Sequence, residues 1–374
     1  MAVSLKKPDV IKNREEYFVA SQWQLMRRKF FKHKLAVAGS GILIVMYLLA
    51  IFCDFIAPYD TSARSEYIYM KPQRVRFVDN AGKFQLRPFI YGIKKDLDPE
   101  TFERLYVEDR EITYPVRFFT PGFDYKLLGV FPAKRHLFGV EAPGRLFLFG
   151  TDNLGRDFFS RNAYAARISL SIGLVGVSIS FVLGLALGGI SGYYGGTPDM
   201  IIQRVIEFLL SIPKIPLWMA LAAALPLDWP VLKVYFGITV ILSMISWTGL
   251  ARVVRGKLLQ LREEDFCTAA KISGARDWHI IAKHLLPSFM SFLIVNLTLA
   301  VPGMILAETA LSFLGIGLRS PAVSWGVLLQ DAQNVRTVAL HPWLLLAPAV
   351  QVIVTVLTFN FVGDGLRDAA DPYK

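Results

Sequence analysis

Cysteine is scarce in this chain of 374 residues, which has only Cys53 and Cys267. Two cysteines exclude a disulfide-stapled secreted fold and a zinc site made of four cysteines. Charged residues are also few, at 19%, against about 25% in a typical soluble domain. The hydrophobic share is 53% and the mean hydropathy is +0.42. This composition is neither disordered nor collagen-like, and it indicates a membrane protein.

Three enzyme signatures are also missing from the sequence. There is no Gly-x-x-x-x-Gly-Lys-Ser/Thr phosphate loop, so we expect that the chain does not bind ATP phosphates itself. The His-Glu-x-x-His zinc motif and the Gly-x-Ser-x-Gly nucleophile elbow are absent too, which argues against a membrane protease or lipase. We therefore expect a protein that is not an enzyme, with no catalytic residue, no metal and no cofactor of its own.

Six hydrophobic runs approach the length of about 20 apolar residues that a transmembrane helix needs. They lie at residues 35–57, 168–190, about 204–225, about 231–250, about 289–313 and 342–363. The first is too long for a signal-peptide core, so we interpret it as an uncleaved anchor. Pro213 and Pro216 interrupt the third run and predict a kink there.

Basic residues predict the orientation of these spans. Residues 1–34 hold nine Lys and Arg, and the loop 251–288 holds seven. Because short basic segments stay in the cytoplasm, this loop and both termini are expected on the cytoplasmic side, with the spans in the cytoplasmic (inner) membrane. The basic tail 1–34 has amphipathic spacing next to the first span, which favours a juxtamembrane helix on lipid headgroups over a nucleic-acid arm.

Residues 58–150 form the largest segment outside the spans. They are dense in aromatic residues and strand formers, with frequent Pro and Gly, so we expect a small β-rich extracytoplasmic insert domain. Asp98 and Pro99 predict one helix near residues 99–108. The insert shows no catalytic constellation, and His136 is its single histidine. The remainder, residues 151–374, holds the other five spans.

The loop 251–288 predicts two short helices joined at Gly274, because glycine readily adopts the left-handed conformation that ends a helix. Asp277 can cap the second helix, and Pro287 can end it. Ala269 and Ala270 make a helix surface that a partner can approach closely. The alternative is that this hairpin simply packs under the helix bundle.

The loop resembles the signature loop of ABC-importer permeases, whose pattern is Glu-Ala-Ala, three residues, Gly, nine residues, Ile, one residue, Leu-Pro. Every spacing is kept here, with Thr268 in place of the Glu and His284 in place of the Ile. The resemblance implies a coupling helix that docks into a groove of a cytoplasmic ATPase. The residues assigned to this role are Asp265, Phe266, Thr268, Ala269, Ala270, Gly274, Ala275, His284, Leu286 and Pro287.

Three further motifs resemble the dipeptide/oligopeptide/nickel branch of that family, and its second permease subunit in particular. They are FGTDNLGRDFFSR at 149–161, LSFLGIG with SWG at 311–317 and 324–326, and GDGLRD with DP at 363–368 and 371–372. The resemblance implies a mainly α, six-helix transmembrane bundle that works by alternating access. It also implies a homologous permease, two ATPase subunits and an extracytoplasmic binding protein as partners.

Ionisable residues inside spans are candidates for the substrate pathway, because each costs about 2.5–3.5 kcal/mol at the centre of a membrane helix. Lys214 lies between the two prolines of the third run, and Glu207 lies two turns earlier. Lys214 could meet a substrate carboxylate, or it could snorkel or pair with the partner permease. Glu308, toward the outer end of the fifth run, could serve gating or lie in the solvated interface.

Peptide import is the favoured function, and oligosaccharide and nickel remain open as substrates. A membrane-anchored sensor or enzyme would need a catalytic constellation in the insert, and none is found. A secondary transporter is disfavoured because the hydropathy shows no inverted repeat. The insert could dock the binding protein, or it could act as a lid or pack against the partner permease.

Overall fold

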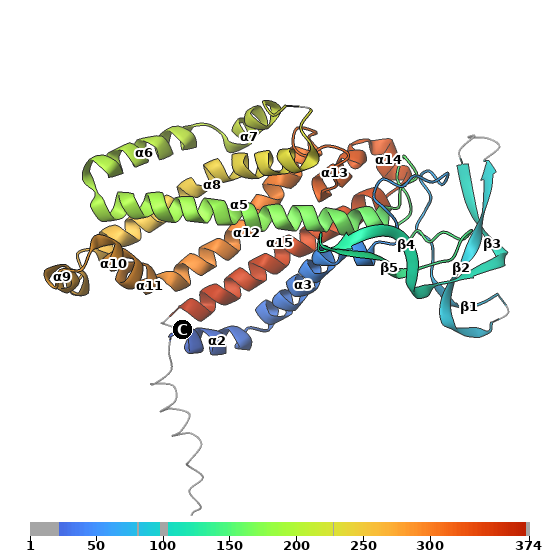
Figure 1. Cartoon of the computed structure of the whole chain (residues 1–374), viewed down its shortest axis with the longest axis horizontal. Coiled ribbons are helices and arrows are strands. Elements are labelled where there is room, and N and C mark those ends of the chain that lie inside the picture. Colours follow the sequence, from blue (N-terminus) through green and yellow to red (C-terminus); the bar gives the residue numbers. More distant parts are fainter. Residues whose placement is uncertain (1–21, 81, 98–103, 227, 372–374) are drawn as a thin grey trace, which may run out of the picture.

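A computed structural model describes residues 22–371 except 81, 98–103 and 227. It shows a bundle of long helices with a β-rich unit at one end (Figure 1). Among the described residues, five helices are long and apolar enough to cross a membrane. They are α3 (Lys34–Ile51), α5 (Phe158–Tyr194), α8 (Val231–Leu261), α12 (Met290–Phe313) and α15 (Trp343–Ala370).

The third span is a broken one. Helices α6 (Gly196–Ser211) and α7 (Lys214–Ala223) meet the criteria for one span together but are bent by 88° at the break between them. Pro213 stands at the start of α7, where its fixed φ and missing N–H are tolerated, and the expected kink is therefore found. The helical run begins at Gly196, eight residues before the predicted start.

The core of the bundle lies between α5, α8, α12 and α15. Leu170 and Ile172 of α5, Leu242 of α8 and Ile305 of α12 are fully buried in it. Small residues let the helices approach one another closely. A Cβ built on Gly365 of α15 would lie 2.2 Å from the Cβ of Ala36 in α3, so a larger residue there would force these two helices apart.

The β-rich unit confirms the predicted insert. Strands β1 (Arg76–Val78), β2 (Phe84–Leu97) and β3 (Arg104–Pro115) form an antiparallel sheet in that order. Strands β4 (Arg117–Leu127) and β5 (Phe131–Gly139) form a separate antiparallel hairpin. The buried core of this unit is small, centred on Ile90, Val116 and Leu146, so many of its aromatic and aliphatic side chains stay on the surface.

The helix predicted at residues 99–108 is wrong where the structure describes it. Residues 98–103 lie outside the described residues, and β3 begins at Arg104. Val107 and Tyr106 pair with Lys94 and Lys95 of β2. The local capping signal of Asp98 and Pro99 is therefore overridden by strand pairing with the preceding strand, β2.

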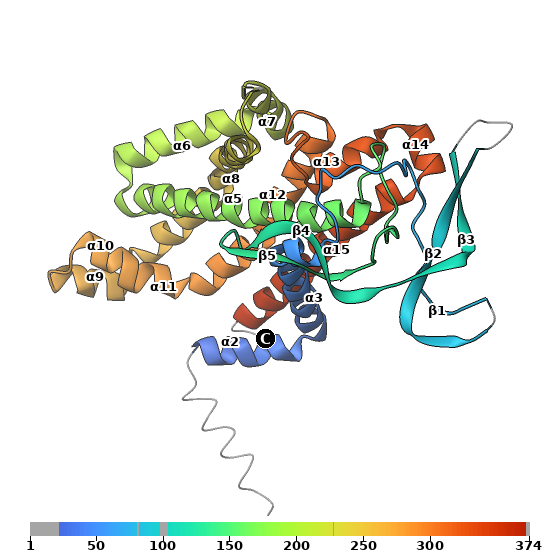
Figure 2. The ribbon, with the colours of Figure 1, turned by 45° about the vertical axis from the view of Figure 1, so that its right-hand side comes forward.

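Short helices cluster at the two ends of the bundle (Figures 1 and 2). The end that carries the β strands, here called the insert end, also holds α13 (Trp325–Gln330), the 3-10 turn Asp331–Gln333, and α14 (Val335–Leu340). The opposite end, here called the loop end, holds α2, α9, α10, a π-helical turn and α11. Their bounds are Gln22–Lys32, Asp265–Ile272, Asp277–Ile280, Ile281–Leu285 and Leu286–Ser288. Helix α2 matches the predicted juxtamembrane helix, and residues 1–21 of the basic tail lie outside the described residues.

Candidate functional site

The segment predicted as a coupling loop is a helical hairpin at the loop end. It is shorter than predicted, because α8 continues to Leu261. Helices α9 and α10 join through Gly274, which has a left-handed φ of +79°. The N–H of Gly274 donates to the carbonyl of Lys271 at 3.0 Å, and the N–H of Ala275 donates to the carbonyl of Ala270 at 3.1 Å. These bonds end α9 in the way that a glycine after a helix permits.

One face of the hairpin is buried against the bundle. Cys267, Ile280 and Leu285 are fully buried among residues of α5, α8 and α12. The hydroxyl of Tyr193, in α5, donates to Oδ1 of Asp277 at 2.6 Å. The expectation that Asp277 caps α10 is wrong: Asp277 is the first residue of α10, and the position before it, Arg276, makes no capping bond.

The other face of the hairpin is exposed, and it carries most of the residues assigned to coupling. Asp265, Phe266, Thr268, Ala269, Gly274, His284 and Pro287 are exposed, whereas Ala270, Ala275 and Leu286 are half-buried. Sequence reasoning missed two residues here. Ile272 is 83% exposed and Trp278 is 74% exposed. The sequence contained a signal for both residues, because large apolar side chains in a charged, polar loop are unusual on a surface that meets only water.

This arrangement satisfies both interpretations of the loop. The buried face fixes the hairpin to the ends of three long helices. The exposed face presents two large apolar side chains beside small residues, which is the composition of a protein-docking surface.

A second feature is a cavity of about 540 Å³ lined by α5, α7, α8 and α12. Lys214 contributes the single charged side chain of its lining, together with the polar residues Ser180, Ser246 and Asn296. Trp218 also lines it, and its indole N–H is buried without a hydrogen-bond partner in the described part of the chain. The bend before α7 brings Lys214 to this cavity.

The other two pathway candidates lie elsewhere. Glu207 is exposed on α6 and pairs with Arg204, with Oε2 at 2.9 Å from Nη1. Glu308 is fully buried in α12, so it does not lie in a solvated interface. It accepts hydrogen bonds from the hydroxyls of Ser312 at 2.7 Å and Ser169 at 3.2 Å. Neither glutamate lines the cavity of Lys214.

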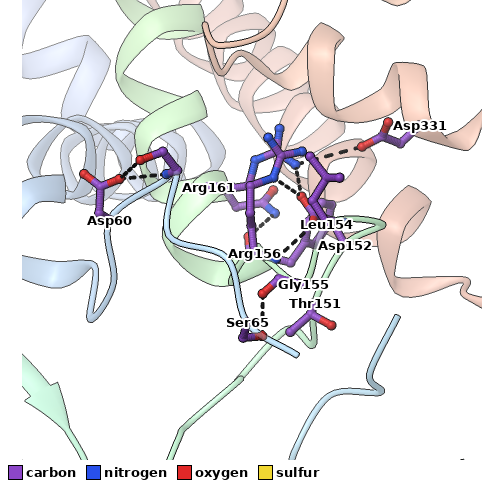
Figure 3. A network of polar contacts seen from close by, with 12 residues as sticks. Asp60, Ser65, Thr151, Asp152, Leu154, Gly155, Arg156, Arg161 and Asp331 are labelled. Atoms are coloured by element: carbon purple, nitrogen blue, oxygen red, sulfur yellow. Dashed lines mark hydrogen bonds and ion pairs between the residues drawn. The ribbon is translucent and has the colours of Figure 1, made fainter. Parts of the chain in front are cut away.

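A network of ion pairs holds the insert end together, built from the motif at 149–161 (Figure 3). Asp152 is fully buried between two guanidinium groups. Its Oδ2 accepts from Nε of Arg156 at 2.7 Å and from Nη1 of Arg161. Arg161 also lies 3.9 Å from Asp331, in the loop after α12. A buried carboxylate needs such partners, because an unpaired charge in the interior is very costly.

The same motif ties the start of the insert to its end. The hydroxyl of Ser65 donates to the carbonyl of Gly155 at 2.6 Å. The N–H of Met70 donates to the hydroxyl of Thr151 at 2.9 Å. The indole of Trp343, at the start of α15, donates to the carbonyl of Thr151 at 3.4 Å. The motif thus joins the insert to α5 and α15 at the insert end, a role that spacing alone did not reveal.

Asp157 completes this network as the N-cap of α5. Its Oδ2 accepts from the N–H of Ser160 at 2.7 Å. Burial raises the pKa of Asp157 to about 7, against the opposing effect of the hydrogen bonds from Ser160. Burial likewise raises the pKa of Asp331 at the edge of the network, while the nearby Arg161 opposes that shift.

Comparison with known proteins assigns the fold to a family. The model of the family described as "Binding-protein-dependent transport system inner membrane component" matches residues 184–373, just over half of the chain. The chain belongs to this family. The permease also matches the model of the "N-terminal TM domain of oligopeptide transport permease C" over residues 21–72. Family membership and the apolar helices together make it a multi-pass membrane component of an ABC importer.

Curated relatives cover both the bundle and the insert. The dipeptide transport system permease protein of Lactococcus lactis is 32% identical over 92% of the permease and 89% of its own length. The dipeptide protein of Bacillus subtilis is 43% identical over 60% of the permease and 68% of its own length. The oligopeptide transport system permease protein of Haemophilus influenzae is 43% identical over 60% of the permease and 70% of its own length.

Among solved structures, an inward-facing methionine ABC transporter has a TM-score of 0.42 at 19% identity. It covers 54% of the permease and 93% of that chain.

Proposed function

We propose that the permease forms half of the pathway by which an ATP-driven importer takes up di- or oligopeptides. A homologous permease would supply the other half, two cytoplasmic ATPases would bind and hydrolyse ATP, and an extracytoplasmic binding protein would deliver the peptide. The proposal of a peptide substrate rests on the similarity to the dipeptide permease of Lactococcus lactis, which extends over 92% of the chain. The permease itself would carry no catalytic residue, metal or cofactor.

The orientation belongs to the same proposal. The loop end, with α2, α9 and α10, would face the cytoplasm together with both termini, and the insert 58–150 would face outward. The basic residues of 1–34 and 251–288 support it. The exposed face of the α9–α10 hairpin would then meet the ATPase, and the coupling residues named above would move with it.

Lys214 gives the pathway a chemical preference. A peptide carries a carboxylate at its C-terminus, and Lys214 is the charged residue in the lining of the 540 Å³ cavity. An ammonium group in a water-filled pathway attracts such a carboxylate as a point charge and releases it easily. Glu207 and Glu308 are less suited to this role, because the first is paired with Arg204 and the second is enclosed by serines.

The test is uptake of peptides into proteoliposomes that hold the complete transporter with its binding protein. The parent should take up a labelled tripeptide in an ATP-dependent manner. Lys214→Met should slow uptake of the free acid at least tenfold, or about 1.4 kcal/mol in transition-state free energy, and should slow the C-terminal amide much less. Lys214→Arg should retain most activity.

Lys233→Met is the control, since Lys233 is an exposed lysine of α8 outside the cavity lining. Equal slowing of acid and amide by Lys214→Met would contradict the carboxylate contact. Uptake of an oligosaccharide or of nickel in place of any peptide would overturn the proposal that the substrate is a peptide.

A further inference from the structure

The β4–β5 hairpin ends in an apolar tip. The tip reads Leu127-Leu128-Gly129-Val130-Phe131. Leu128 is 54% exposed, Val130 is 68% exposed and Phe131 is 63% exposed. Turns that meet water are usually made of Asn, Asp, Gly or Ser. A run of large apolar residues at an exposed turn therefore indicates that the tip contacts something other than water.

The backbone of the turn strengthens this point. Leu128 and Gly129 both have left-handed φ values, +55° and +76°. A turn with φ > 0 at both central residues strongly favours Asn-Gly or Asp-Gly, and leucine is disfavoured there. Leucine thus occupies position 128 although the backbone conformation there disfavours it. We therefore infer that its side chain makes favourable contacts outside the turn.

The hairpin does not point away from the bundle but runs back along it (Figure 2). Nδ1 of His136, in β5, lies 3.1 Å from the carbonyl oxygen of Asp54 in α4 (Cys53–Ile56). The rings of Phe119 and Phe55 lie 6.0 Å apart. Leu127, next to the tip, lines an apolar groove of about 520 Å³ with Val45 and other residues of α3 and α4.

This groove places the tip at the depth of the lipid. Val45 lies six residues before the end of α3, or about 9 Å along the helix axis. Helix α3 has 18 residues, about 27 Å of helix, which is slightly less than the hydrocarbon thickness of about 30 Å. The level of Val45 is therefore inside the hydrocarbon region. Val45, Leu48 and Leu49 are exposed on the face of α3 that continues into the tip.

The turn pairs two of the backbone amides that such a position would otherwise leave unpaired. The N–H of Gly129 donates to the carbonyl of Lys126 at 2.9 Å, and the N–H of Val130 donates to the carbonyl of Leu127 at 3.1 Å. These bonds satisfy amides that hydrocarbon would otherwise leave unpaired. Lys126 is exposed, and its long side chain can reach up to the headgroups.

We propose that the tip of the β4–β5 hairpin inserts into the bilayer beside α3, in the leaflet on the insert side, with lipid acyl chains covering Leu128, Val130 and Phe131. The insert would then be held at the membrane surface by two attachments, the ion-pair network and this hairpin. This inference rests on α3 as a membrane span and not on the peptide as substrate.

A depth measurement tests the proposal. A fluorophore is attached to Leu128→Cys in the complete transporter in nanodiscs, with Cys53 and Cys267 replaced by Ala. Leu86→Cys is the matched control, because Leu86 is 88% exposed on β2, away from α3. We expect quenching at position 128 by lipids brominated on the acyl chain and little by aqueous iodide, with the reverse at position 86.

Two results would overturn the proposal. Iodide quenching at 128 as strong as at 86 would place the tip in water. Protection from both quenchers would place it against the partner permease. A second variant gives an independent sign. Leu128→Asn suits the left-handed backbone, so it should raise the thermal midpoint if the tip lies in water and lower it in nanodiscs if the tip lies in lipid.

Discussion

At the scale of single residues, charge burial at the insert end is the feature that most depends on pH. Asp152 keeps two arginines as partners, so its charge is compensated. Asp157 has no cation in direct contact among the described residues, and its second carboxyl oxygen has no hydrogen-bond partner there. The two carboxylates of one motif thus have different roles: the first is an ion-pair centre, and the second is a buried helix cap whose pKa is raised to about 7.

This difference predicts a pH dependence of stability. Between the ordinary aspartate pKa of about 4 and the native value of about 7, the folded protein holds a proton that the unfolded chain releases. Stability should therefore fall as pH rises through this window, by at most about 1.4 kcal/mol per unit for this group. Asp157→Asn should flatten that fall, since its amide oxygen can still accept from the Ser160 N–H.

The measurement is the thermal midpoint in detergent from pH 4.5 to 8, compared between the parent and Asp157→Asn. Asp124→Asn is the control, because Asp124 is exposed and its carboxylate pairs with the ammonium of Lys134 at 3.1 Å. Parallel curves for the parent and Asp157→Asn would contradict the raised pKa.

At the scale of elements, the α9–α10 hairpin shows how one short segment serves two surfaces. Its buried residues hold it to the bundle, whereas Ile272 and Trp278 are mostly exposed in the described part of the chain. Substitutions on the two faces should therefore have different consequences. Buried-face changes should lower stability, and exposed-face changes should affect only the partner.

We expect Ile272→Asp and Trp278→Asp to lower ligand-stimulated ATPase activity of the assembled transporter at least tenfold while leaving membrane insertion and the thermal midpoint of the permease unchanged. Gly274→Val should have a similar effect on activity, because valine disfavours a φ of +79° and would reshape the turn. Val335→Asp is the control, an equally exposed apolar residue at the insert end. Normal stimulated hydrolysis in the exposed-face variants would make the hairpin a packing element only.

At the scale of the whole molecule, the two ends of the bundle differ in what they carry. The loop end has α2, α9 and α10, and the insert end has the β strands and the ion-pair network (Figure 1). The proposed orientation assigns these ends to opposite sides of the membrane. The broken span α6–α7 is what makes the number of crossings even, because the other described spans number five.

Labelling of single cysteines in intact cells tests this topology. Phe31→Cys and Ile272→Cys, both exposed, should resist a membrane-impermeant thiol reagent until the cells are opened. Leu86→Cys should react from outside. The native Cys53 and Cys267 are both buried, so they should add little background. Reaction of Ile272→Cys in intact cells would contradict the six-span orientation.

The sequence predicted much of the architecture, and the reason is that hydropathy and motif spacing are local properties. The five long spans could be located from the sequence, and most of their ends lie within a few residues of the predicted ones. The prolines marked the break before Lys214. Helix ends were less well predicted: α5 begins at Phe158, ten residues before the predicted start, because the capping of Asp157 extends the helix beyond its apolar stretch. The start of β3 was missed because the local capping signal of Asp98 and Pro99 was given more weight than pairing with the preceding strand β2.

By itself, the sequence determined the class of protein, the number of apolar runs, the small β-rich insert and the family motifs, since each follows from residues that are close together in the chain. Only the tertiary structure decided which charges are buried, which apolar residues face outward and where the insert lies against α3. Glu308 and Trp278 show the reason. The exposure of each depends on which distant segments pack around it, so the serines of α5 and α12 enclose the first, and the described residues leave most of the second exposed.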